Sequence, residues 1–185
     1  YKLCALEYHD KNIVRIEKEY KKTLKNILKN PSFKEFASIE TIIPEIMFEF
    51  EAFLFQCKAF LDIYSQAVGN FFGQKPTNIK KLKKVLMSRK EAPAYKLLKL
   101  LEKSIWLTEF ESSKQFKKTK RDIITHYSII KLSCISVQKL ERKKFNTIRT
   151  KIENKLVLDY TRTMIKRLRI LMFDTIKIIE EHMNM

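Results

Sequence analysis

Glycine and proline are scarce in this chain, with two and four residues respectively among 185. Tight turns between strands depend on these residues, so an all-β fold with many hairpins is disfavoured. No apolar run approaches the roughly 20 residues that a membrane-spanning helix needs. The opening stretch YKLCALEYHDKN also lacks the charged and apolar regions of a signal peptide. We therefore expect a helical, cytoplasmic protein that does not enter a membrane.

Cysteine is also rare. Cys4, Cys57 and Cys134 are odd in number, far apart and surrounded by apolar residues, so they predict neither a disulfide framework nor a zinc site. The chain has no glycine-rich phosphate loop, no HExxH pattern and no acidic cluster suited to magnesium. We accordingly expect a protein that uses no metal and no cofactor.

Acidic residues are few relative to basic ones, with 21 Asp and Glu against 38 Lys and Arg and a formal net charge of +17. Such an excess favours a polyanionic partner, and RNA, DNA and an anionic membrane surface are the candidates. The basic residues are spread over several segments and do not form one cationic amphipathic helix, which disfavours the membrane. The alternative is a compositional bias in which the lysines are simply solvated.

Apolar residues recur at helical spacing along most of the chain. They predict an all-α, up-and-down bundle of about five helices in a single domain, residues 1–185. The expected helices cover about 3–29, 44–68, 78–89, a stretch that begins near Ala94 and includes Ile105 and Trp106, and about 153–183. Residues 129–152 are rich in Ile, Val, Thr, Phe and Ser, which favours a small β-hairpin there.

The segment 44–68 is apolar around most of its circumference and should be the central buried helix. Its polar residues form two stripes on opposite sides: Glu45, Glu49 and Gln56 on one, Glu51, Lys58 and Asp62 on the other. One stripe can face water, whereas the other must meet a partner because an unpaired buried charge is costly. Alternatively, both stripes lie at the edges of an incompletely buried helix. In the following loop, 69–78, two phenylalanines either anchor a partner or pack back onto the core.

Histidine is the rarest titratable residue, with three copies. His9 and His182 lie near the ends of the chain in polar surroundings, and we expect both at the surface. His126 differs because Asp122 precedes it by four residues, where a carboxylate can orient an imidazole and raise its pKa. Arg121 and Thr125 form a second pair with the same spacing.

Arg121 and His126 are five residues apart, which places their side chains about 140° apart on an ideal helix. They do not share one face, so convergence on one small group favours a composite site with a second chain. The same stretch also reads as a capping box, with Thr119 at the N-cap and Asp122 three residues later. On that interpretation the neighbouring lysines are solvated and His126 is an ordinary polar residue.

The stretch RDIITH, residues 121–126, resembles the RxxxxH motif of the HEPN superfamily, in which a polar residue such as Asp often follows the arginine. The layout is also similar: an apolar helix upstream, the motif opening a late helical segment, and a long last helix. The resemblance implies a metal-independent endoribonuclease that acts as a homodimer, of the kind found in toxin–antitoxin and abortive-infection systems. It implies acid–base transfer by His126, phosphate binding by Arg121 and orientation of His126 by Asp122.

In such an enzyme, substrate contacts would come from Lys117, Lys118, Lys120, Thr125 and Tyr127. Glu51 is a candidate supporting acid. An antitoxin or other regulatory protein would be a further partner. Some relatives carry a modifiable tyrosine two residues after the histidine; here that position is Ser128, which puts such regulation in doubt. The superfamily also contains non-catalytic members, so a helical module that binds nucleic acid or protein is the alternative.

Overall fold

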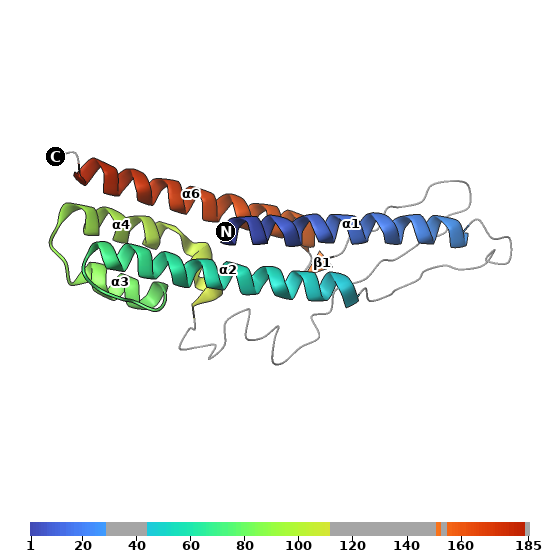
Figure 1. The fold of residues 1–185 in the computed structure, drawn as a ribbon, viewed down its shortest axis with the longest axis horizontal. Helices are drawn as coiled ribbons and strands as arrows, with labels where there is room; N and C mark the ends of the chain where they lie inside the picture. Colours follow the sequence, from blue (N-terminus) through green and yellow to red (C-terminus); the bar gives the residue numbers. More distant parts are fainter. Residues whose placement is uncertain (29–43, 112–150, 153–154, 184–185) are drawn as a thin grey trace.

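Helices dominate the structure, a computed structural model that describes residues 1–28, 44–111, 151–152 and 155–183 (Figure 1). The helices are α1 (Lys2–Leu28), α2 (Pro44–Phe71), α3 (Ile79–Met87), α4 (Ala92–Lys103), the 3₁₀ helix η2 (Ile105–Phe110) and α6 (Val157–Met183). Two short strands, β1 (Lys151–Ile152) and β2 (Lys155–Leu156), pair antiparallel just before α6. The prediction of an all-α fold is confirmed.

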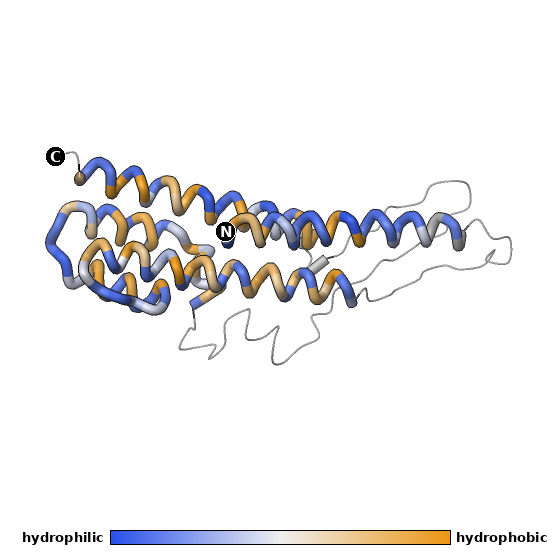
Figure 2. The backbone as a smooth tube through the Cα atoms, viewed as in Figure 1, coloured by the Kyte–Doolittle hydropathy of each residue, from blue (hydrophilic) through white to orange (hydrophobic). Residues whose placement is uncertain are grey.

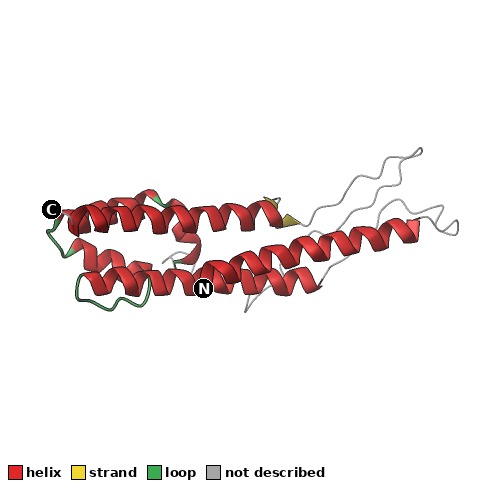
Figure 3. Ribbon diagram, turned by 45° about the horizontal axis from the view of Figure 1, so that its top comes forward, coloured by secondary structure: helices red, strands yellow, loops and turns green. Residues whose placement is uncertain are grey.

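The long helices α1, α2 and α6 run side by side, and α1 is antiparallel to the other two (Figures 1 and 3). At one end of the bundle α1 packs on α2 and α6. At the other end α3 packs on α2, and α4 packs on both α3 and α6. Helices α2 and α6 therefore run through both halves of the bundle, while α1 belongs to one half and α3 and α4 belong to the other.

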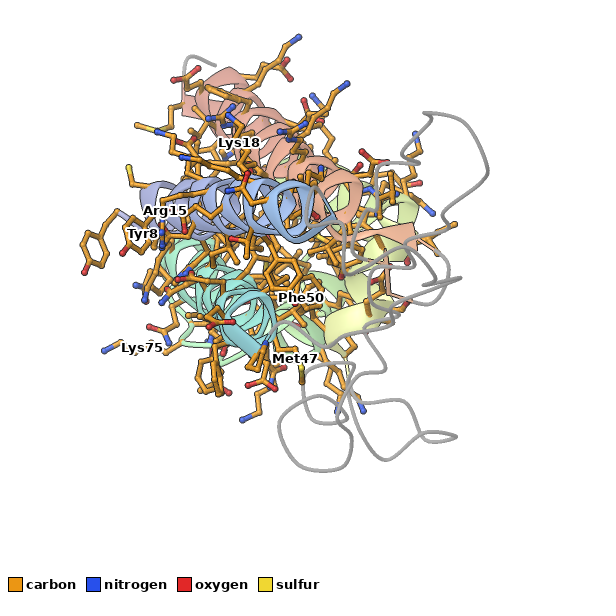
Figure 4. The ribbon with its side chains drawn as sticks, turned by 90° about the vertical axis from the view of Figure 1, so that its right-hand side faces the viewer. Tyr8, Arg15, Lys18, Met47, Phe50 and Lys75 are labelled. Atoms are coloured by element: carbon orange, nitrogen blue, oxygen red, sulfur yellow. The ribbon has the colours of Figure 1, made fainter. Side chains whose placement is uncertain are left out.

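Helix α2 supplies more of the core than any other described helix. Its inward face is buried along its whole length, from Ile46 to Val68, and Figure 4 shows Phe50 between α1 and α2. Leu6 and Ile13 of α1, Leu82 and Leu86 of α3, Leu97 and Leu101 of α4, and Leu168 and Leu171 of α6 complete the core. The expectation that residues 44–68 form the central helix is confirmed.

Most predicted helix limits agree with the structure, but the fourth helix is shorter than expected. We expected Ile105 and Trp106 to continue it, whereas α4 ends at Lys103. The hydroxyl of Ser104 donates a 2.9 Å hydrogen bond to the carbonyl of Leu100, and the backbone then tightens into η2. A serine can satisfy a carbonyl of the last turn in this way, which favours a helix end there.

The last helix also begins later than predicted, at Val157, because Lys155 and Leu156 pair with β1. Most of the hairpin predicted at 129–152 lies outside the described residues. Its last two residues form β1.

The turn that follows α2 depends on Gly69 in the last turn of the helix and on Gly73 and Pro76 beyond it. Gly73 has a positive φ of 68°, which favours glycine. A Cβ atom on Gly69 would lie only 2.1 Å from Cδ of Pro76, so the absence of a side chain lets the loop fold back against α2. Phe72 is buried in the core and Phe71 remains partly exposed. Of the two expected phenylalanines, one therefore packs onto the core.

Across the described ranges, no helix combines the length and apolar character required to cross a membrane.

Candidate nucleic-acid interface

The predicted catalytic and substrate-binding residues lie outside the described residues: Arg121, Asp122 and His126, with Lys117, Lys118, Lys120, Thr125 and Tyr127. Their roles in catalysis and substrate binding therefore remain predictions from the sequence. Glu51 is the one predicted site residue that the described part of the chain contains, and it lies on α2, partly exposed.

The two polar stripes of α2 have different surroundings. On the first, Glu49 and Gln56 face α1, where Lys2 donates a 3.0 Å hydrogen bond to Oε1 of Gln56. On the second, Nζ of Lys58 lies 2.5 Å from Oδ1 of Asp62, and this pair stays within the helix. The prediction that one stripe meets a partner is therefore confirmed for the stripe that faces α1.

His9 is the partner of that first stripe, and our expectation of a surface residue was wrong. Its side chain is only 16% exposed, and Nδ1 lies 2.6 Å from Oε2 of Glu49. Asn12, one turn further along α1, donates a 2.9 Å hydrogen bond to the other oxygen of the same carboxylate. Together they fix α1 on α2 through one acidic side chain. This contact could not be predicted from local spacing, because Glu49 is 40 positions from His9 in the chain.

A second, partly buried polar contact joins η2 to α6. The hydroxyl of Tyr160 donates a 2.9 Å hydrogen bond to Oε2 of Glu109. Burial raises the pKa of Tyr160 well above the usual range, and the charge of Glu109 raises it further. Burial likewise raises the pKa of the Cys57 thiol, with a smaller contribution from Glu109. These groups stay protonated at neutral pH, so they support the fold and offer no activated nucleophile.

Several exposed lysines lie on α3 and in the loops next to it. We call Lys75, Lys80, Lys81, Lys84 and Lys90 the basic patch; all five are exposed. Lys80, Lys81 and Lys84 share the outer face of α3, while Ile79, Leu82 and Leu86 hold its inner face against the core. In Figure 2 the loops that flank α3 are hydrophilic, and Figure 4 shows Lys75 pointing away from the bundle.

The start of α3 is well defined. The side chain of Asn78 caps the helix by accepting a 2.9 Å hydrogen bond from the amide of Lys81. This cap fixes where the lysine face begins, and the positive end of the helix dipole adds to the charge there.

Two cations next to the basic patch, Lys83 and Arg89, have acidic partners. Lys83 forms a 2.8 Å ion pair with Glu111. Arg89 donates a 2.7 Å hydrogen bond to the carbonyl of Phe72 and lies 3.8 Å from Glu91. Within the described ranges, no ion pair involves a lysine of the basic patch. Among the described residues, no acidic side chain therefore competes with an anionic ligand for these lysines.

Two pockets are less suited to an anion. One, of about 260 Å³ between α1 and the start of α6, contains Lys18, Lys21 and Arg162. Glu17 is 3.7 Å from Lys21 and Asp10 is 3.9 Å from Arg162, so its cations are largely balanced. The other, of about 470 Å³ between α1 and α2, is lined by three glutamates, Glu19, Glu45 and Glu49. The net charge of this second pocket is negative, which disfavours binding of an anion.

Among the residues that the structure describes, no cluster of His, Cys, Asp or Glu side chains is arranged to hold a metal ion. No protein-family model matches the chain, and neither a curated protein nor a solved structure does. The basic patch is thus the strongest candidate interface in the described part of the chain.

Proposed function

We propose that this chain is a cytoplasmic protein that binds RNA, and that the basic patch around α3 contacts the phosphates. The observation that carries the proposal is five exposed lysines with no ion-pair partner in the described residues. Phosphate contacts of this kind release counterions and supply affinity without reading sequence. The net charge of +17 adds long-range attraction for the same ligand.

The more specific form of the proposal is a metal-independent endoribonuclease of HEPN type. It is supported by the stretch 121–126, which resembles the RxxxxH motif, and by the all-α fold. His126 would transfer the proton of the ribose 2′-hydroxyl, Arg121 would hold the scissile phosphate, and Asp122 would orient His126. Two copies of the chain would complete one site, as a toxin or antiviral effector. The alternative is a non-catalytic helical module with the same basic surface.

Binding is tested with a fluorescent single-stranded RNA and the triple variant Lys80→Glu, Lys81→Glu, Lys84→Glu. We expect affinity to fall by about 10-fold or more, since each reversed charge removes one phosphate contact. The matched control reverses Lys11, Lys18 and Lys22 of α1, which are equally exposed. An equal loss in both triple variants would show diffuse attraction and contradict the assignment to α3.

Cleavage is tested separately, by incubating RNA with the protein in a chelator and analysing the product ends. We expect 2′,3′-cyclic phosphate ends, with activity abolished in His126→Ala and Arg121→Ala while RNA binding persists. Cleavage that survives in His126→Ala, or that requires a metal, would exclude the HEPN mechanism. Binding without product at any protein concentration would establish the non-catalytic module.

A further inference from the structure

Helices α3 and α4 pack directly against each other at one end of the bundle (Figure 1). Only residues 88–91 connect them, and a connection this short joins antiparallel neighbours. Positions equally far from the middle of the connection therefore lie side by side. Lys84 is level with Tyr95 in this way, and Lys80 is level with Lys99.

The edge of α3 that faces α4 and η2 is identified by Lys83. Its 2.8 Å ion pair reaches Glu111, the residue that follows η2. Lys80 precedes Lys83 by three positions and Met87 follows it by four, so these three side chains share one face of the helix. Met87 is 70% exposed, and Lys84 lies beside it on the outer surface. Two lysines and an exposed apolar side chain therefore lie along the α4 edge of α3.

The edge of α4 that faces α3 is the one that carries Tyr95. On the other edge, Lys96 forms a 3.0 Å ion pair with Glu181 of α6. The buried positions of α4, Ala94 and Leu101 among them, lie between these two edges around the helix. Because Lys96 lies toward α6, Tyr95 lies toward α3.

The ring of Tyr95 is largely open to solvent, with 62% of the residue exposed. Nζ of Lys99, one turn later, lies 5.5 Å from the ring centroid, and this is the one ring contact of Tyr95 within the described ranges. Proteins that bind single strands combine such rings, on which bases stack, with cations that contact the phosphates. We call Lys80, Lys84, Met87, Tyr95 and Lys99 the α3–α4 surface.

Acidic side chains at the border of the α3–α4 surface do not reverse its charge. Glu91 lies 3.8 Å from a guanidinium nitrogen of Arg89, and Glu102 lies 3.3 Å from Nζ of Lys99. Each carboxylate is therefore already close to a cation. The two α3 lysines of this surface have no ion-pair partner in the part of the chain that the structure describes.

We propose that Tyr95 is a stacking platform for an unpaired base, so that the RNA bound at the basic patch is single-stranded where it crosses α4. The inference deepens the proposed function and rests on RNA binding at α3. In a duplex the bases stack on each other inside the helix, whereas a base of a single strand can turn outward onto an aromatic ring. Lysine contacts to phosphates carry no base readout, so the ring supplies a contact that the lysines lack.

The first test compares a single-stranded RNA with the duplex of the same sequence, by fluorescence anisotropy. Tyr95→Ala should weaken binding of the single strand by about 5-fold or more, and it should leave binding of the duplex unchanged. Tyr95→Phe keeps the ring, so it should retain affinity within about 2-fold. The matched control is Tyr8→Ala on α1, because Tyr8 is 61% exposed and lies outside the α3–α4 surface. It should leave both affinities unchanged.

The salt dependence of binding separates stacking from charge. Tyr95→Ala should keep the slope of log affinity against log salt, because the ring makes no phosphate contact. A reduced slope would show that the variant disturbs the lysines, and it would overturn the assignment of stacking to Tyr95. Circular dichroism of each variant checks that the fold is retained.

Ultraviolet cross-linking locates the base without a disruptive substitution. After cross-linking to the single strand and digestion with trypsin, a nucleotide should be found on the peptide 91–96, which contains Tyr95. Cross-links confined to other peptides would overturn the proposal.

The outcomes distinguish this inference from the proposed function. Binding that depends on the α3 lysines but is equally strong in Tyr95→Ala would overturn the stacking platform alone. An equal loss in Tyr8→Ala and Tyr95→Ala would do the same. Absence of binding to either RNA would overturn both the proposed function and this inference.

Discussion

The phenol of Tyr160 and the carboxylate of Glu109 meet at 2.9 Å although they are 51 positions apart in the chain. The contact joins the 3₁₀ helix η2 to the first turn of α6. It exists because α4 ends at Lys103 and Ser104 caps it, since the tighter backbone that follows carries Glu109 to the surface of α6. The raised pKa of Tyr160 keeps its hydroxyl a donor over the physiological pH range.

Replacement of Tyr160 by phenylalanine should destabilise the protein. The change removes the partly buried hydrogen bond that the phenol donates to the Glu109 carboxylate, and such losses cost about 1–3 kcal/mol. Urea unfolding would measure the difference. Tyr95→Phe is the matched control, since Tyr95 is exposed on α4 and its replacement should change stability by less than about 0.5 kcal/mol. Equal stability of the two variants would contradict a structural role for the bond.

Stability should fall in alkaline solution through two tyrosines, the buried Tyr64 and the partly buried Tyr160. Burial raises the pKa of Tyr64 to about 12 from its ordinary value of 10.0, despite a hydrogen bond with Thr175 that lowers it. The pKa of Tyr160 is raised in the same direction. A raised folded-state pKa means that the unfolded chain binds fewer protons than the folded chain above pH 10. The stability that the two protonated tyrosines contribute is therefore complete below about pH 10. It is lost as the pH rises toward about 12.

The double variant Tyr64→Phe, Tyr160→Phe should show a shallower decline of unfolding free energy over this pH range. Phenolate absorbance gives an independent measurement, since these two tyrosines should ionise only as the protein unfolds. A decline identical to that of the parent chain would show that other groups control alkaline unfolding.

The helices were predictable because local signals defined them. The Asn–Pro pair after the first helix and Pro44 at the start of α2 mark their ends, and apolar spacing marks their buried faces. The positions of Ile105 and Trp106 were not predictable, because continued apolar periodicity masked the break at Ser104. Periodicity reports which face is buried, whereas a helix end depends on single capping contacts.

Gly69 and Gly73 should respond differently to alanine. At Gly69 a Cβ atom would lie 2.1 Å from Cδ of Pro76 and 2.9 Å from the carbonyl oxygen of Gln74. The loop must move, and overpacking of this kind costs about 1–3 kcal/mol or more. A Cβ atom on Gly73 would have no neighbour within 4 Å. The cost of alanine there comes only from holding it at a positive φ, about 1–2 kcal/mol.

Thermal unfolding of Gly69→Ala, Gly73→Ala and Gly73→Asn would separate the two effects. Asparagine tolerates a positive φ, so Gly73→Asn should recover part of the loss. Gly69→Ala as stable as the parent chain would show that the contact with Pro76 is not tight.

Salt should weaken RNA binding in proportion to the phosphate contacts that the basic patch makes. For single strands each contact contributes about 0.7 to the slope of log affinity against log salt. The variant Lys80→Gln, Lys81→Gln, Lys84→Gln should therefore reduce the slope by about 2. Fluorescence anisotropy at several salt concentrations gives the slope, and the glutamine variants of Lys11, Lys18 and Lys22 should keep it. If the α3 variant leaves the slope unchanged, the RNA phosphates contact a surface other than the basic patch.

The candidate interface was less predictable than the fold. Net charge indicated a polyanionic partner, but it did not distinguish paired from unpaired lysines. Lys83 and Lys84 are adjacent in sequence, yet only Lys83 reaches Glu111, which is 28 positions away. His9 shows the same limit, because its partner Glu49 lies on another helix. Such pairings depend on helix packing, which composition and spacing do not specify.

Helix α1 has few fully buried side chains of its own; among those described they are Leu6, Ile13 and Glu17. It nevertheless covers much of α2, because α1 and α2 form the most extensive helix–helix contact in the described part of the chain, whereas α2 and α6 touch little. Detachment of α1 would therefore uncover the apolar face of the first half of α2. The amides of α1 and α2 should accordingly exchange hydrogen at similar rates, through one cooperative opening.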